Sequence, residues 1–215
     1  MTAYTDLLAV ANEAVDLARD LLRSHQPSVV MAKGDRDMVT DLDLTIERRV
    51  RALLAKRTPT IGCIAEEEGA SGPARDLMWA LDPIDGTANF VHGSPLCGVS
   101  LGLIRRGRPV LGVIDMPFLS ARYTAVQGEG AHVNGAPLRT SETTDLAEAL
   151  VAIGDYAVGY NAARRNRLRL ELTRRLAPAV QRIRMHGSAA LDLAWLAEGR
   201  LDAVITLSNL SLIHI

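Results

Sequence analysis

The stretch that most constrains this chain is LMWALDPIDGTANF, residues 77–90. Its first part is apolar and typical of a buried strand, yet two aspartates, Asp82 and Asp85, follow directly. A buried carboxylate is unfavourable unless a partner compensates it. Pro83 fixes its own φ and has no N–H group, which favours a turn in which both aspartates face one pocket. The sequence therefore predicts a strand that ends on Asp82, with Asp85 in the turn after it.

The rest of the chain has the pattern of a layered α/β protein without an internal repeat. Apolar residues spaced along one helical face predict helices over 5–24 and 44–57, separated by a loop at 33–37. From residue 60 on, short apolar runs divided by Gly and Pro predict strands, with a turn at Asn134-Gly135. The expected strands are IGCIA (61–65), LMWALD (77–82), CGVSLGLI (97–104), PVLGVI (109–114), RYTAV (122–126), GAHV (130–133), ALVAI (149–153), VQRIRM (180–185) and LDAVITL (201–207).

Two further helices are expected near 160–177 and 188–199. The first is rich in arginine, and we expect it to be a solvated helix whose Leu168, Leu172 and Leu176 point inward.

Composition argues against several classes of function. The formal charge of −1 gives no sign of a nucleic-acid partner, and aromatic residues, at 4%, are too few for base stacking. No stretch of the sequence is apolar over a length that could span a bilayer, so no membrane association is expected. Cys63 and Cys97 have no metal or redox spacing and are expected to be buried thiols in a reducing compartment. These features predict a cytoplasmic protein.

Acidic residues cluster at two further element ends. Glu66, Glu67 and Glu68 follow the apolar run that ends at residue 65, and Asp41 and Asp43 stand just before the helix at 44–57. Carboxylates gathered at neighbouring strand ends repel one another unless a cation neutralises them. Ligands that are all oxygen suit Mg²⁺ rather than zinc.

The turn after Asp82 adds groups that suit phosphate. The backbone carbonyl of Ile84 is a candidate extra metal ligand, and the N–H groups of Gly86 and Thr87 form an anion site if a helix starts there. Each cluster taken alone has an ordinary explanation: a solvated run for the glutamates, a helix cap for Asp43, and a surface turn for the D-P-I-D-G-T sequence. Their joint arrangement after apolar runs predicts metal-dependent phosphate chemistry.

These motifs resemble the inositol monophosphatase family, part of a superfamily shared with fructose-1,6-bisphosphatase. DPIDGTANF, AEEEG and TDLD carry the resemblance, together with MHGSAALDLAWLAEGRLDAV at 185–204. The similarity covers residues 1–209, and the segments MPF, RYTAV and RMHGS look most like actinobacterial members. The fold that it implies is an α/β protein of αβαβα sandwich architecture.

The resemblance also implies roles for individual residues. Two or three Mg²⁺ ions would be bound, Asp43 and Thr87 would act with Glu66 on the attacking water, and Asp85 would reach a substrate hydroxyl. Lys33 would lie on a mobile loop near a further metal. The implied metal ligands are Glu66, Asp82, the Ile84 carbonyl and Asp85; the implied phosphate-binding groups are those of Gly86 and Thr87; and Gly187, Ser188 and Ala189 would line the alcohol side.

The implied activity is Mg²⁺-dependent hydrolysis of a small phosphorylated polyol or amino alcohol, foremost inositol-1-phosphate. Histidinol phosphate and sugar or nucleotide phosphates are open alternatives. A homodimer, when full length, and lithium sensitivity are also implied. Two other interpretations stay open: a phosphatase of the haloacid-dehalogenase type, with Asp41 of the D-x-D-x-T sequence as nucleophile, and a cation-binding homologue without turnover.

The chain departs from the family pattern at a few places. Thr206 stands near the position of a substrate-contacting glutamate, and GTANF has Ala88 where GTTNF is common. After Asn209 the family continues with a Trp-Asp pair whose aspartate binds a metal, whereas this chain reads LSLIHI at 210–215. That hexapeptide matches the translation of a transposase end used in sequencing libraries. We therefore expect a domain over 1–209, incomplete at its C-terminus, poorly soluble and nearly inactive, followed by a non-native tail.

Overall fold

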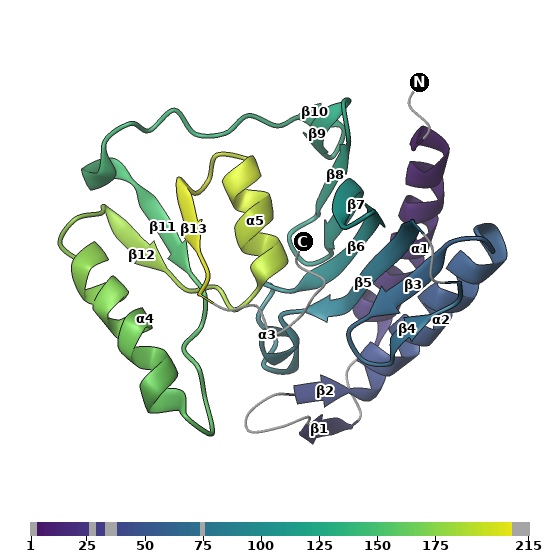
Figure 1. The fold of residues 1–215 in the computed structure, drawn as a ribbon, viewed down its shortest axis with the longest axis horizontal. Coiled ribbons are helices and arrows are strands. Elements are labelled where there is room, and N and C mark those ends of the chain that lie inside the picture. The colour runs from purple at the N-terminus through teal and green to yellow at the C-terminus, as the bar shows by residue number, and fades with distance from the viewer. Residues whose placement is uncertain (1–3, 26–28, 33–37, 74–75, 208–215) are drawn as a thin grey trace.

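The computed structural model describes residues 4–25, 29–32, 38–73 and 76–207. The elements form five layers: two helices, a large sheet, one helix, a small sheet and an outer helix (Figure 1). This order is the predicted αβαβα sandwich. The helices are α1 (Thr5–Ser24), α2 (Asp41–Arg57), α3 (Thr87–Val91), α4 (Ala162–Leu176) and α5 (Ala189–Ala197).

The large sheet has eight strands in the order β10-β9-β8-β7-β6-β5-β3-β4. Its pairs are antiparallel except for β3 and β5, which run parallel and so end at the same edge. The Asn134-Gly135 turn joins β9 to β10 as expected, with both residues at positive φ. The strands are β3 (Gly62–Ala65), β4 (Gly69–Ser71), β5 (Leu77–Asp85), β6 (Gly98–Arg105), β7 (Arg108–Met116), β8 (Ala121–Val126), β9 (Gly130–Val133) and β10 (Ala136–Pro137).

The small sheet has three parallel strands, with β11 (Leu150–Ile153) between β12 (Arg182–Arg184) and β13 (Ala203–Ile205). Helix α5 lies between the two sheets, and α4 covers the outer face of the small one (Figure 1). Leu176 packs against the small sheet as predicted. The prediction for Leu168 was wrong, because this side chain is 64% exposed.

The sequence pattern does not predict a short hairpin that the structure contains. Strands β1 (Val30–Ala32) and β2 (Met38–Thr40) pair antiparallel and lead directly into α2. The predicted loop at 33–37 lies outside the described residues. A 3₁₀ turn, η1 (Leu146–Glu148), precedes β11 and was also not predicted.

Helix α2 begins three residues earlier than predicted, and the reason is its cap. Thr40 is the N-cap: its side chain accepts a hydrogen bond from the backbone N–H of Asp43, whose carboxylate in turn accepts one from the Thr40 N–H. This reciprocal capping box satisfies two amides that the first helical turn leaves without partners. Asp43 is therefore inside the first turn of α2 rather than before it.

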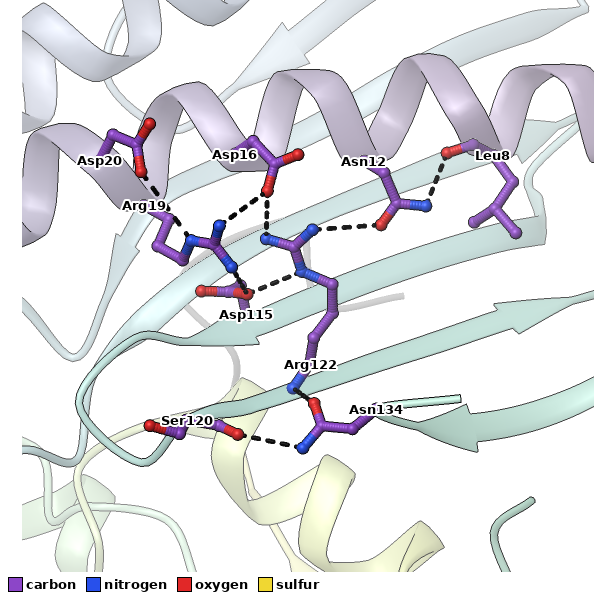
Figure 2. Close-up of polar contacts among 9 residues, drawn as sticks. All are labelled: Leu8, Asn12, Asp16, Arg19, Asp20, Asp115, Ser120, Arg122 and Asn134. Atoms are coloured by element: carbon purple, nitrogen blue, oxygen red, sulfur yellow. Dashed lines mark hydrogen bonds and ion pairs between the residues drawn. The ribbon is translucent and has the colours of Figure 1, made fainter. Parts of the chain in front are cut away.

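Helix α1 packs its apolar stripe on the large sheet, and Ala11, Val15 and Leu22 are buried as expected. At the edge of this interface a charged network joins α1 to β7 and β8 (Figure 2). Asp115, 3% exposed, pairs with Arg122 at 2.7 Å, and Arg122 reaches Asp16 on α1 at 2.9 Å. Charged groups buried between layers are tolerated when paired in this way.

The two cysteines lie in the interior of the protein. Cys63 and Cys97 are buried and free, as the sequence predicted. Burial raises the pKa of their thiols to about 11 and about 12.

Among the residues described, no helix has the length and apolar character needed to cross a membrane.

Candidate active site

Glu66 and Asp82 meet at the shared edge of β3 and β5. The two strands pair in parallel with Ala65 opposite Leu81, and the Glu66 N–H donates to the Leu81 carbonyl at 3.3 Å. Because the next residue of each strand then faces the same edge, the two acids are neighbours. Asp82 is 2% exposed, whereas Glu66 is exposed. The structure thus brings together the two carboxylates that the sequence predicted at these strand ends.

The prediction that β5 ends at Asp82 was wrong. The strand continues to Asp85, which pairs with Gly98, and its register with β6 shifts between Asp82 and Asp85. Pro83 cannot donate to the ladder, so the strand bulges there instead of ending. The bulge places Asp85 on the site side of the sheet without leaving the strand.

Asp85 connects the end of β5 to the start of α5. Its carboxylate accepts hydrogen bonds from the Ser188 hydroxyl, from the Ala189 N–H at 3.2 Å and from the Ala190 N–H at 2.9 Å. A carboxylate at this position satisfies the first amides of the helix and is favoured by its dipole. Ser188 and Ala189, two of the three residues expected on the alcohol side, are therefore in direct contact with an expected metal ligand.

Gly86 turns the chain from β5 into α3. Its φ is 86°, and a Cβ there would stand 2.9 Å from the Leu96 carbonyl oxygen, so only glycine fits without strain. Helix α3 then starts at Thr87, whose hydroxyl lies 3.0 Å from the Ile84 carbonyl and 3.4 Å from Oδ1 of Asp43. The structure thereby joins Asp43, on α2, to the D-P-I-D-G-T segment.

Asp43 is almost fully buried, at 1% exposure. Its Oδ2 accepts hydrogen bonds from the Thr40 N–H at 2.8 Å and the Thr40 hydroxyl at 2.5 Å. Burial outweighs these bonds and raises its pKa to about 6, with a further contribution from the nearby Glu66. A carboxyl group with such a pKa can accept a proton near neutral pH.

The acidic side chains of the site share one electrostatic environment. The pKa of Asp82 is raised well above its ordinary value, first by burial and then by the charges of Asp85, Glu66 and Asp43. Four carboxylates from α2, β5 and the turn after β3 thus act on one centre. Their oxygen chemistry and mutual repulsion fit a hard divalent cation such as Mg²⁺.

Among the described residues, the acidic side chains of this site do not form a complete set of metal ligands. Within the described part of the chain, no group of three or more His, Cys, Asp or Glu side chains could hold a metal ion as it stands. The Asp85 carboxylate faces the start of α5, and that of Asp43 faces Thr40.

Two residues that organise this region were missed in the sequence. Asn89 on α3 donates one amide hydrogen to the Leu96 carbonyl at 2.8 Å and another to the His186 carbonyl at 2.7 Å. Glu47 on α2 is fully buried and bonds the turn that contains Glu66. Its spacing of four residues from Asp43 places both on one helical face, which was the available signal.

His186 was left out of the predicted site, and its side chain has structural contacts. Nδ1 lies 2.5 Å from Oδ1 of Asp192, and the ring meets the edge of Trp195 with centroids 5.0 Å apart. Burial raises the pKa of Asp192, while the His186 contact opposes that rise. The imidazole therefore packs against α5.

The remaining predicted positions are spread around the site. Thr206 is exposed just after β13. Lys33 and the expected tail at 210–215 lie outside the described residues. Asp41 is the first residue of α2 and follows a three-residue hairpin strand, where its Oδ1 accepts from the Val29 N–H. The haloacid-dehalogenase interpretation needs Asp41 after a central buried strand, and this arrangement does not provide one.

Fold and site define an αβαβα protein whose acidic strand ends converge on one polar centre. A family model described as "Inositol monophosphatase family" matches residues 3–213. "Probable inositol 1-monophosphatase ImpA" of Mycobacterium tuberculosis is 38% identical over 203 residues, which are 93% of this chain and 74% of the relative. "Fructose-1,6-bisphosphatase/inositol-1-monophosphatase" of Aquifex aeolicus is 32% identical over 173 residues, 80% of this chain and 64% of the relative.

Solved structures agree. The extragenic suppressor protein suhB of Bartonella henselae superimposes with a TM-score of 0.89 at 31% identity, covering 98% of this chain and 81% of that one. The Thermotoga maritima IMPase gives a TM-score of 0.84 at 32% identity, covering 94% of this chain and 76% of that one. The chain belongs to the inositol monophosphatase family, a family of phosphatases.

Proposed function

We propose that this protein hydrolyses a small phosphate monoester, foremost inositol-1-phosphate, with Mg²⁺ and a water molecule as nucleophile. The observation that carries the proposal is the convergence of Asp43, Glu66, Asp82 and Asp85 on one centre, through the pairing of β3 with β5 and the contact of Thr87 with Asp43. Burial and the charges of the other three carboxylates raise the pKa of Asp82. Four carboxylates around one centre repel one another, and a bound cation would relieve this repulsion. The family is generally Mg²⁺-dependent, which agrees with that expectation.

Glu66, Asp82, Asp85 and the Ile84 carbonyl are the groups proposed to hold the metal ions, two or three in number. When bound, Mg²⁺ supplies Lewis-acid stabilisation of phosphoryl oxygens and lowers the pKa of a coordinated water. The protein's part is to fix the geometry of these oxygens. The β5 bulge lies between Asp82 and Asp85, and their carboxylates are close enough for their charges to interact.

Asp43 and Thr87 are proposed to handle the proton of the attacking water. The Thr87 hydroxyl donates toward Oδ1 of Asp43 and can accept a hydrogen bond from water with its own lone pair. Because the pKa of Asp43 is about 6, the carboxylate is ionised at pH 7 and above yet basic enough to receive the proton. Glu66 completes the proposed catalytic set as a metal ligand beside this pair.

The phosphate and alcohol sides of the substrate are assigned to different segments. The N–H groups of Gly86 and Thr87 are proposed to hold phosphate oxygens, and Gly187, Ser188 and Ala189 to border the alcohol. In support, Ser188 and Ala189 already bond the Asp85 carboxylate, so this segment is next to the metal-binding acids. Turning Asp85 toward Asp82 would leave these donors facing the substrate's hydroxyl groups.

Substrate choice is tested with a panel of monoesters. We expect phosphate release from inositol-1-phosphate to exceed that from histidinol phosphate, fructose-1,6-bisphosphate and a nucleotide 3′-phosphate. Fructose-1,6-bisphosphate belongs in the panel because a relative is named for that activity. Each substrate is assayed across a Mg²⁺ titration and again with a chelator.

A matched pair of variants makes the assay decisive. Asp82→Asn removes a buried carboxylate of the centre, and we expect it to abolish Mg²⁺-dependent turnover. Glu142→Gln, a change at an exposed glutamate, should leave turnover unchanged. Mg²⁺ binding in calorimetry without turnover of any monoester would favour the cation-binding homologue, and equal turnover in chelator would overturn the proposal.

We further propose a cytoplasmic homodimer that lithium inhibits. These points rest on membership of the family. Sedimentation velocity and a lithium titration at fixed Mg²⁺ test them; a monomer at micromolar concentration or unchanged turnover in lithium would contradict them.

A further inference from the structure

Helix α2 contributes a second buried acid, Glu47, that belongs to none of the groups proposed above. Glu47 is 0% exposed and lies one helical turn after Asp43. Residues four apart share a face of a helix, so both carboxylates point toward the sheet edge where β3 and β5 end. A carboxylate this deeply buried is costly unless several groups compensate it.

The compensation comes from the turn that contains Glu66. Oε2 of Glu47 accepts the Glu67 N–H at 2.8 Å, and Oε1 accepts the Glu68 N–H at 2.9 Å. Two consecutive amides of residues 66–68 are thereby held by the two oxygens of one side chain. Because Glu66 is directly before these amides, its backbone is fixed on both sides, by Glu47 and by the bond to Leu81.

Helix α2 holds the same turn at two more points. Arg51 forms an ion pair with Glu47 at 3.2 Å and donates to the Gly69 carbonyl. Arg48 pairs with Glu68 at 2.7 Å on the outside of the turn. Helix α2 thus carries Asp43 in its first turn, and residues in its second and third turns bind the turn that contains Glu66.

We propose that Glu47 is a positioning residue of the cation site, which sets Glu66 in register with Asp82 by clamping residues 66–68 to α2. The inference rests on the proposed function, since it concerns cation binding at that centre. A carboxylate is required, because both partners are N–H donors and only a side chain with two acceptor oxygens can meet both. An amide at this position would direct its own N–H₂ group at one of the donors.

The test uses Glu47→Gln, with Mg²⁺ binding measured by calorimetry beside steady-state kinetics. We expect Mg²⁺ affinity to fall about tenfold or more, as for other residues that orient a metal ligand without contacting the metal. At saturating Mg²⁺ we expect kcat to stay within about threefold of the parent, since Asp43 and Thr87 are untouched. A loss of kcat with unchanged Mg²⁺ affinity would overturn the inference.

Two further variants separate positioning from mere stability. Val50→Ala removes buried volume from the same helix without touching the turn, so it should lower the free energy of unfolding but keep Mg²⁺ affinity. Glu47→Asp keeps the charge but is too short to reach both amides, and should weaken Mg²⁺ binding in a folded protein even where the glutamine variant fails to fold. Equal weakening in Val50→Ala, or parental affinity in a folded Glu47→Asp, would overturn the inference.

Measuring both Mg²⁺ binding and phosphate release by the parent protein separates this inference from the proposed function. Mg²⁺ binding without phosphate release refutes the hydrolase proposal, while the effect of Glu47→Gln on binding still tests the clamp. Turnover that depends on Mg²⁺, together with unchanged Mg²⁺ affinity in Glu47→Gln, refutes the clamp alone.

Discussion

The side-chain amide of Asn89 donates a hydrogen bond to the backbone carbonyl of His186 at 2.7 Å, across 97 residues of sequence. This bond joins α3, at the end of the large sheet, to the segment that leads into α5. Gly187, next to His186, packs so closely that a Cβ there would stand 3.2 Å from the Asn89 amide nitrogen. The two halves of the candidate site are therefore tied by one side chain as well as by Asp85.

Replacing Asn89 should separate those halves. Asn89→Ala leaves two carbonyls without their donor, and we expect a loss of about 1–3 kcal/mol in the free energy of unfolding, together with a raised KM for the phosphate monoester. Chemical denaturation and steady-state kinetics measure the two effects. Asn166→Ala is the matched control, because Asn166 makes two hydrogen bonds to Ala157 far from the site. It should cost stability without raising KM; a similar KM for Asn89→Ala and the parent would contradict the prediction.

Gly86 should tolerate no side chain. Gly86→Ala combines a positive φ of 86° with a contact of 2.9 Å to the Leu96 carbonyl oxygen. Gly128→Ala is the control, since Gly128 has a φ of 83° but nothing within 4 Å of its Cβ position. We expect the control to lose about 1–2 kcal/mol, the cost of a left-handed residue, and Gly86→Ala to lose clearly more. Equal losses in denaturant unfolding would show that the close contact relaxes freely.

Asp43 should make stability depend on pH. Its folded pKa is about 6 against an ordinary value of 3.8, so the folded chain holds this proton more tightly than the unfolded chain. The contribution to stability is therefore fully present below pH 3.8 and is lost as the pH rises through about 6. In chelator we expect this group to lower the free energy of unfolding by about 3 kcal/mol between pH 3.5 and pH 7.

Asp43→Asn isolates that contribution from other buried acids. The difference between the parent and Asp43→Asn, measured by thermal or urea unfolding across the pH range, should change mainly between pH 4 and pH 6. Parallel pH profiles for the two proteins would refute the assignment.

The charged network between α1 and the large sheet should be sensitive to the loss of one partner. Arg122→Met leaves the buried Asp115 with weaker compensation, and we expect a loss of about 3–5 kcal/mol in the free energy of unfolding. Adding Asp115→Asn to it should recover part of that loss. The control is Arg106→Met at an exposed pair with Asp76, where we expect at most about 1 kcal/mol. Equal losses at the two arginines would contradict this account.

Local patterns were enough to predict most of the fold. The apolar stripe of α1 and the short runs of the large sheet follow helical and strand periods, and both are present. Local patterns also located Glu66 and Asp82, because each directly follows an apolar run of the sequence. The β1–β2 hairpin was missed because its strands have three residues each, too few to show a period.

Other features depend on contacts that a local pattern does not contain. The continuation of β5 through Pro83 depends on pairing with β6. The roles of Asn89 and Glu47 depend on partners 97 and 20 residues away. Leu168 was expected inside from helical spacing alone, but which helical face is covered depends on tertiary packing, and Leu168 is exposed.

The arginines of α4 and β12 give the molecule an uneven distribution of charge. Residues 162–184 contain eight of the 24 basic residues and one of the 25 acidic ones, which leaves 16 basic and 24 acidic residues elsewhere. Helix α4 lies at one end of the long axis, far from α1 and α2 (Figure 1). Although the net charge is only −1, the separation of basic from acidic residues gives the molecule an electric dipole. At low ionic strength we therefore expect the two ends to bind exchangers of opposite charge, and we expect added salt to weaken both interactions.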